Sequence, residues 1–223
     1  MILMGSKENT DLDPSKFELK PKLYFKQIAI KKIMLHAIEY SNPNRSKWHW
    51  REVMGLLGGK IEGYKVIITD SFAITHGSHF HVSYNDKNYI VAAKINSLLY
   101  DEGNGEFFTG WYHTHPGLGF FYSDTDIINH LGYQDVNPYA IGIVFDHEGY
   151  RRQQKFFAVY TLNIASFGVV GYQEIDYKIQ GIPKNKEIDK LKEIFDRILF
   201  YWNIDFVESA EKTVLCKMLP KEK

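Results

Sequence analysis

The sequence centres on residues 113–126, HTHPGLGFFYSDTD. His113 and His115 are separated by one residue, and Asp126 follows eleven residues after the second histidine. Ser123 lies three positions before that aspartate. A zinc ion with three nitrogen or oxygen ligands from the protein keeps its fourth position for water, as in catalytic sites. The spacing therefore predicts a catalytic zinc site with His113, His115 and Asp126 as ligands and Ser123 close to the metal.

The chain around these residues has the local patterns needed to bring them together. Residues 105–112 are rich in aromatic side chains, which favours a strand, and alternate side chains of a strand point to the same face. The run 116–119, PGLG, breaks that strand and turns the chain. Residues 123–126 then open an apolar run with helical spacing. Strand, turn and helix can thus return Asp126 to the two histidines.

Each part of the pattern also has an ordinary structural explanation. Ser-x-x-Asp is a common capping box, with Ser123 as the N-cap and Asp126 at the third helical position. A His-x-His pair alone is often two histidines on a partly exposed strand. The combination at this spacing is what favours a metal site.

The same residues resemble a known family. His-x-His, seven residues and Ser-x-x-Asp match the signature of the JAMM (MPN-plus) metalloproteases, and Glu52 followed by VMGLLGG matches their upstream glutamate and apolar strand. The lead-in GWY at 110–112 is similar to the proteasome-lid-type deubiquitinase and its archaeal relatives. The resemblance extends over about residues 25–162. It implies an α/β fold, with a curved mixed sheet flanked by helices and a C-terminal helix.

The resemblance also implies a function. A zinc-dependent isopeptidase would hydrolyse the bond between the C-terminal glycine of ubiquitin, or a ubiquitin-like modifier, and a lysine amine. One catalytic zinc ion would activate water, Glu52 would act as the general base, and Ser123 would stabilise the oxyanion. Two alternatives stay open: a zinc hydrolase that trims sulfur-carrier or small-molecule adducts, and a non-catalytic MPN scaffold subunit.

Substrate and partner expectations follow from the same resemblance. The histidine-rich segment 76–83 stands where proteasome-lid relatives carry an insertion over the modifier's tail. An extended peptide can add a strand to such a segment, so the expected substrate-binding residues are Phe80, His81, Val82 and Ser83. The expected partners are ubiquitin or ubiquitin-like conjugates, with a proteasome or another MPN-type subunit as a further candidate.

Composition restricts the remaining function classes. The 223 residues carry 27 basic and 27 acidic side chains, and this balance argues against a nucleic-acid partner. The single cysteine excludes an internal disulfide and suits a reducing cytoplasm, and no apolar run reaches membrane-spanning length. The expected organisation is a mobile leader at 1–20, a catalytic domain at 21–182, and a C-terminal helix and tail at 183–223.

Hydrophobic patterning predicts the rest of the fold. Trp48 and Trp50 are expected to pack in the core, and residues 147–149 are expected to form a turn. An amphipathic helix over 86–99 is expected to press Ile90, Val91, Ile95 and Leu98 against the sheet. The pattern further predicts strands at 23–28, 65–74, 139–145, 154–162 and 172–179, and helices ending before Ser41 and spanning 188–202.

Overall fold

The computed structural model describes residues 21–77, 86–101, 104–164 and 170–203. The expected leader at 1–20 and the substrate segment Phe80 to Ser83 lie outside these ranges. The elements are, in chain order, β1 (Lys22–Phe25), α1 (Gln27–Tyr40), η2 (Lys47–His49), β2 (Val53–Glu62), β3 (Lys65–His76), α2 (Asp86–Asp101), β4 (Phe107–Thr114), α3 (Asp124–Val136), β5 (Ile141–Phe145), α4 (Gly149–Gln153), β6 (Phe157–Ile164), β7 (Val170–Glu174), β8 (Tyr177–Ile179), η3 (Lys184–Lys186) and α5 (Glu187–Asn203).

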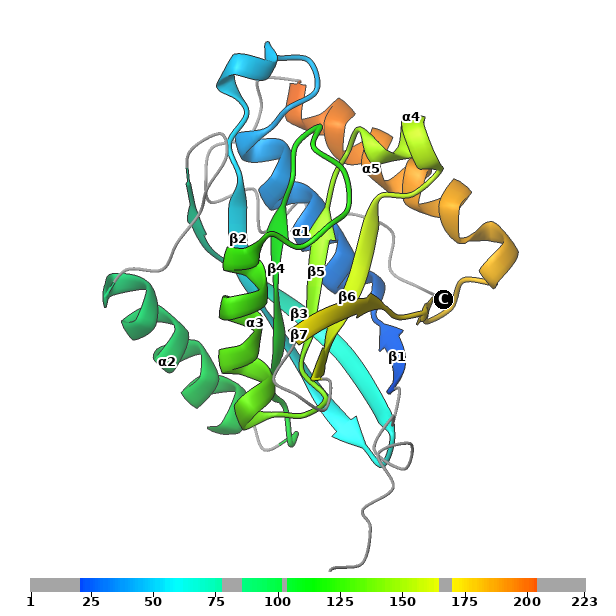
Figure 1. Cartoon of the computed structure of the whole chain (residues 1–223). Coiled ribbons are helices and arrows are strands. Elements are labelled where there is room, and N and C mark those ends of the chain that lie inside the picture. The colour runs from blue at the N-terminus through cyan, green and yellow to red at the C-terminus, as the bar shows by residue number, and fades with distance from the viewer. Residues whose placement is uncertain (1–20, 78–85, 102–103, 165–169, 204–223) are drawn as a thin grey trace, which may run out of the picture.

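One mixed sheet forms the centre of the structure (Figure 1). Its eight strands lie in the order β7-β6-β5-β4-β2-β3-β1-β8. The long β2–β3 hairpin is antiparallel, and β4 pairs antiparallel with β2 but parallel with β5. Parallel neighbouring strands run in the same direction, so the C-terminal ends of β4 and β5 lie side by side. The crossover that joins these two strands contains α3.

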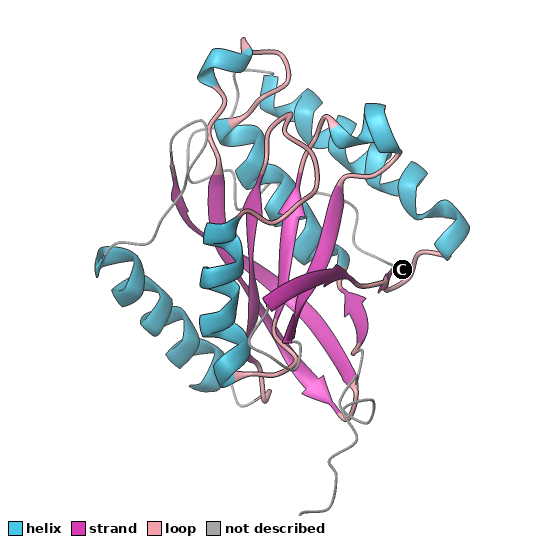
Figure 2. Cartoon of the chain, viewed as in Figure 1, coloured by secondary structure: helices cyan, strands magenta, loops and turns pink. Residues whose placement is uncertain are grey.

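Helices cover both faces of this sheet (Figure 2). On one face, α1 and α5 pack on each other and on the sheet, where they bury a large apolar cluster that includes Phe25, Met34, Phe145 and Ile198. On the other face, α3 covers a smaller cluster around Trp111, Tyr122 and Val144. The expected α/β architecture, with a curved mixed sheet, flanking helices and a C-terminal helix, is confirmed.

The expected strand at 172–179 is wrong as a single element. The chain forms β7 and β8 instead, and these two strands lie at opposite edges of the sheet. Between them, the Ile175 side chain is buried and its N–H donates to the Val159 carbonyl at 2.9 Å. An alternating pattern cannot reveal this break, because both pieces alternate and the break falls on a buried residue.

Two expectations about side-chain packing need correction. Trp50 is buried, but Trp48 sits in the short helix η2 and is 84% exposed. The helix over 86–99 exists as α2, but Ile90, Val91 and Leu98 are exposed. Of the four residues expected to pack, Ile95 is partly buried, and its neighbour Leu99 is buried. The turn expected at 147–149 is confirmed at 147–148 and leads directly into α4, which begins at Gly149. Among the described residues, no helix combines the length and hydropathy needed to cross a membrane.

Candidate metal centre

The two histidines lie at the end of β4, at the centre of the sheet. His113 is within β4 and His115 follows its last residue, and both side chains are buried. Pairing between β2 and β4 sets Met54 opposite His113, and the Val53 N–H donates to Thr114 Oγ1 at 2.9 Å. This register fixes the start of β2 beside the two histidines.

Glu52 precedes β2 by one residue and is 5% exposed. Side chains two apart in an extended chain share a face, so Glu52 lies on the same side as Met54. Met54 packs in the cluster of Trp111, whose ring stacks on His113. Glu52 therefore lies on the face of the sheet that carries the histidines.

Asp126 reaches the histidines from the first turn of α3. Ser123 is the N-cap: its Oγ accepts from the Asp126 N–H at 3.2 Å, while Asp126 Oδ2 accepts from the Ser123 N–H at 2.8 Å. The capping box predicted as the ordinary alternative is thus present. It uses Oδ2, whereas Oδ1 lies 3.3 Å from His113 Nε2. One aspartate can therefore cap the helix and face the histidines at the same time.

Three donor atoms converge at this point. His113 Nε2 and His115 Nε2 are 3.0 Å apart, and Asp126 Oδ2 lies 3.9 Å from His115 Nε2. One ligand atom from each of the three residues falls within 4.8 Å of the others. Two imidazole nitrogens and one carboxylate oxygen are a donor set that zinc accepts with an open fourth position. The three residues therefore fit a zinc ion.

Different contacts orient the two imidazole rings. The His113 ring stacks on Trp111 with centroids 4.7 Å apart, and Trp111 Nε1 donates to His130 Nδ1 at 2.9 Å. His115 instead has Nδ1 3.2 Å from the Gly119 carbonyl. If Nδ1 carries the proton of this bond, Nε2 keeps its lone pair for a metal.

Sequence reasoning missed part of this support. His130 belongs to α3, and its side chain is fully buried and accepts a hydrogen bond from Trp111 Nε1. The hydrogen bond joins residues 19 positions apart, and an isolated histidine in a helix gives no local signal for it.

Burial and neighbouring groups shift the pKa values of Glu52, His115 and Asp126 in different directions. Burial, with a contribution from the Asp126 charge, raises the pKa of Glu52 to about 8. Burial, together with His113, lowers the pKa of His115 to about 4, so this imidazole is neutral and able to bind a metal. Burial acts to raise the pKa of Asp126, but hydrogen bonds from His113 and Ser123 outweigh it and lower that pKa to about 2.

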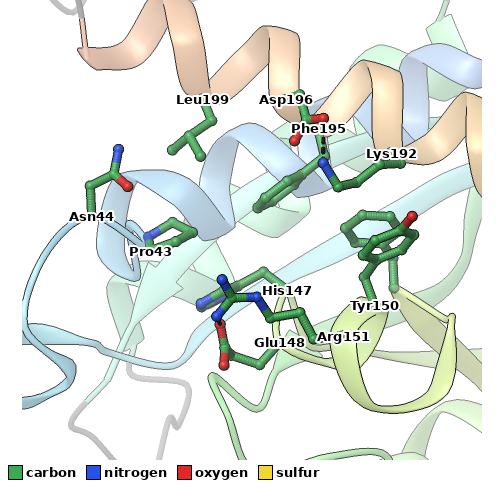
Figure 3. Close-up of a pocket in the computed structure, with 11 residues that line it drawn as sticks. Pro43, Asn44, His147, Glu148, Tyr150, Arg151, Lys192, Phe195, Asp196 and Leu199 are labelled. Atoms are coloured by element: carbon green, nitrogen blue, oxygen red, sulfur yellow. Dashed lines mark hydrogen bonds and ion pairs between the residues drawn. The ribbon is translucent and has the colours of Figure 1, made fainter.

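A separate pocket of about 240 Å³ lies between the start of α4 and one side of α5 (Figure 3). Its lining includes His147, Arg151, Lys192 and Phe195. Of the described residues that line it, none is Glu52, Ser123 or a proposed metal ligand. The three residues His113, His115 and Asp126, called the donor cluster below, are therefore separate from this pocket.

Comparison with known proteins identifies the family of this chain. Residues 23–139, more than half of the chain, match the family described as JAB1/Mov34/MPN/PAD-1 ubiquitin protease. The ubiquitin carboxyl-terminal hydrolase RPN11 of Saccharomyces cerevisiae is 26% identical over 99% of this chain and 70% of its own length. COP9 signalosome complex subunit 5 of Dictyostelium discoideum is 34% identical over 55% of this chain and 36% of its own length. The 26S proteasome non-ATPase regulatory subunit 14 of Caenorhabditis elegans is 29% identical over 60% of this chain.

The family match covers the strands from β1 to β4 and the donor cluster where β4 meets helix α3. The chain belongs to the JAB1/Mov34/MPN/PAD-1 ubiquitin protease family.

Proposed function

We propose that this protein is a zinc-dependent isopeptidase. It cleaves the bond between the C-terminal glycine of ubiquitin or a ubiquitin-like modifier and a lysine amine. The observation that carries the proposal is the convergence of His113, His115 and Asp126 on the face that carries the buried Glu52. Relatives named as a ubiquitin hydrolase and as proteasome and signalosome subunits support the substrate class and the expectation of partner subunits.

Each protein group has a distinct role in this mechanism. His113, His115 and Asp126 would hold the zinc ion, which when bound supplies Lewis-acid polarisation of the scissile carbonyl. Glu52 receives the proton of the attacking water on its carboxylate and passes it to the leaving amine. A general base works best when its pKa lies near the working pH, and burial raises the pKa of Glu52 towards that range.

Ser123 would assist at the carbonyl oxygen. Its Oγ donates to Asp126 Oδ2 at 2.7 Å in the structure. To stabilise an oxyanion, the hydroxyl proton turns away from Asp126 towards the substrate. Asp126 keeps its bond from the Ser123 N–H in that arrangement, so α3 stays capped.

Cleavage of a lysine-linked ubiquitin conjugate by zinc-loaded protein tests the proposal. Glu52→Gln is the matched control, because it keeps the size of the side chain and removes the proton acceptor. We expect both proteins to bind one zinc ion, measured by elemental analysis, and only the wild type to cleave. Equal cleavage by both proteins would contradict the role of Glu52.

The two alternatives give different results in the same assays. A non-catalytic scaffold would bind no zinc, and the complete donor set speaks against it. A hydrolase of sulfur-carrier or small-molecule adducts would bind zinc, lose activity in the Glu52→Gln variant, and cleave those adducts in preference to lysine-linked conjugates. A panel of adducts therefore separates the two enzymes.

The segment Phe80 to Ser83 remains the proposed contact for the modifier's tail, with His81 and Val82 in its middle. Proline has no backbone N–H and cannot donate to an added strand. We expect Val82→Pro to raise KM for conjugates and to leave zinc content unchanged. Unchanged kinetics would show that this segment does not pair with substrate.

The cytoplasm is the proposed location of the protein.

A further inference from the structure

Asp146 is a fully buried acidic residue that the mechanism above does not use. It directly follows β5 and is 0% exposed. Its Oδ1 accepts from the Gly117 N–H at 2.8 Å and from the Glu148 N–H at 2.9 Å, and Oδ2 accepts from the Gly119 N–H at 3.0 Å. One carboxylate thus joins the loop after β5 to the turn after β4.

That turn contains the hydrogen-bond acceptor for a proposed zinc ligand. The Gly119 carbonyl lies 3.2 Å from His115 Nδ1, and the Gly119 N–H donates to Asp146. Gly117 and Gly119 have φ values of 78° and 96°, a region that glycine adopts without the steric strain of a side chain. Glycines alone leave a turn conformationally free, so the contacts to Asp146 select one conformation.

The loop that carries Asp146 is itself fixed from the opposite side. The next residue, His147, packs edge-on against Trp50 with ring centroids 4.5 Å apart. Its ring is also parallel to that of Phe195 in α5, with centroids 6.3 Å apart, and both residues line the pocket in Figure 3. The Asp146 N–H donates to the Phe156 carbonyl at 2.9 Å. The carboxylate is therefore held by the core of the protein.

We propose that Asp146 is a positioning residue for the metal centre. It fixes the Gly119 carbonyl, and through that carbonyl the orientation and tautomer of His115, so that Nε2 faces the metal. This inference rests on the proposed zinc centre. Partners that orient a metal-binding histidine typically change metal affinity by about 10–100-fold when they are removed. Because Asp146 acts through one intermediate residue, we expect an effect near the lower limit.

Asp146→Asn tests the link. The asparagine Oδ1 can keep the two bonds from Gly117 and Glu148, which leaves its NH₂ group against the Gly119 N–H. Two donors then face each other, so this variant breaks the contact to Gly119 selectively. We expect the zinc Kd, measured by competition with a chelator, to rise about tenfold.

Two further variants separate positioning from general stabilisation. Glu187→Gln is the matched control: Glu187 is 5% exposed and accepts from the Ile179 N–H at 3.0 Å, which ties α5 to β8. We expect it to lower the Tm and to leave the zinc Kd within about twofold of the wild-type value. Arg152→Gln is a second test that preserves the core, because the exposed Arg152 donates from Nη1 to the Gly117 carbonyl at 2.9 Å. It should weaken zinc binding in the same direction as Asp146→Asn, by a smaller factor.

A spectroscopic measurement tests the tautomer directly. In the ¹H–¹⁵N spectrum of zinc-loaded wild type, His115 should show a protected Nδ1–H, and Asp146→Asn should broaden or shift it while Glu187→Gln does not. A folded Asp146→Asn protein with wild-type zinc affinity and this resonance unchanged would overturn the inference. If Asp146→Asn does not fold, an unchanged zinc Kd in Arg152→Gln overturns it. If the wild type binds no zinc, the proposed zinc centre is refuted. The His115 Nδ1–H resonance of the zinc-free protein then still tests whether Asp146 fixes the tautomer of His115.

Discussion

In zinc-free protein, the burial of Glu52 makes folding stability depend on pH. Its pKa is raised from 4.5 to about 8 in the folded state. Between these values the folded protein holds a proton that the unfolded chain releases, so the free energy of unfolding falls as pH rises. The stabilising contribution of Glu52 protonation is greatest below pH 4.5 and is lost progressively up to about pH 8.

The size of this effect follows from the two pKa values. Each unit of pKa difference corresponds to about 1.4 kcal/mol. Integration from pH 5 to pH 7 gives a loss of about 2–3 kcal/mol from this one side chain. Glu52→Gln is neutral at every pH and has nearly the same shape, so the variant should lack this loss.

Urea unfolding of zinc-free wild type and Glu52→Gln at pH 5, 6, 7 and 8, followed by tryptophan fluorescence, measures the difference. Buried neutral histidines give a slope of the opposite sign, but both proteins share them and the subtraction removes them. We expect the variant to gain stability relative to wild type by about 2–3 kcal/mol between pH 5 and pH 7. Zinc should reduce this gain, because a nearby cation favours the ionised carboxylate.

Two parallel stability profiles, within about 0.5 kcal/mol across that pH range, would refute the reasoning. They would mean that Glu52 is hydrated in the folded protein and titrates near its ordinary pKa. The effect of zinc is a separate control. If the stability difference between wild type and Glu52→Gln is unchanged after zinc loading, the Glu52 carboxylate is not close enough to the metal for the cation to favour its ionised form.

Other variants test the remaining groups. His113→Ala should lose both zinc and turnover, and retained stoichiometric zinc would contradict its assignment as a ligand. Ser123→Ala should lower turnover by about 10²–10³-fold, as expected for an oxyanion donor, and the free energy of unfolding by about 1 kcal/mol through loss of the N-cap; a stability loss without the kinetic loss would leave Ser123 as a cap only. Burial lowers the pKa of His36 and of His147 to about 3. Below pH 6.5 these histidines therefore bind protons in the unfolded chain but not in the folded protein, and the free energy of unfolding should fall as pH drops. His147→Phe should flatten part of that fall in urea unfolding, and an unchanged slope would show that His147 is not buried in its neutral form.

The residues of the donor cluster could be predicted from the sequence because they are close together in it. Two histidines at alternate strand positions and an aspartate in the first turn of the next helix share one short segment. Local geometry brings such residues together in many tertiary settings. The assignment of Glu52 needed the family resemblance, because a glutamate before a strand is usually solvated and gives no signal of its own.

Features that depend on distant contacts could not be predicted in this way. Asp146 is an isolated aspartate after a buried strand, and its bond to Gly117 spans 29 positions. Trp48 and Trp50 look equivalent in the sequence, yet only Trp50 reaches the core, where its Nε1 donates to the Asn42 carbonyl. Helical periodicity correctly placed α2, but three of the four residues expected to pack, Ile90, Val91 and Leu98, are exposed.

The break between β7 and β8 has a consequence for solubility. Eight strands laid flat would separate the two edges by about 34 Å, yet the two residues between Glu174 and Tyr177 allow at most about 11 Å of chain. The sheet must therefore curl until one short segment supplies both of its edge strands. Exposed strand edges are templates for pairing with other chains. A single proteolytic cut at Asp176 would loosen both edges at once. The nicked protein should aggregate while its donor cluster, three strands from the β7 edge and four from the β8 edge, is still folded.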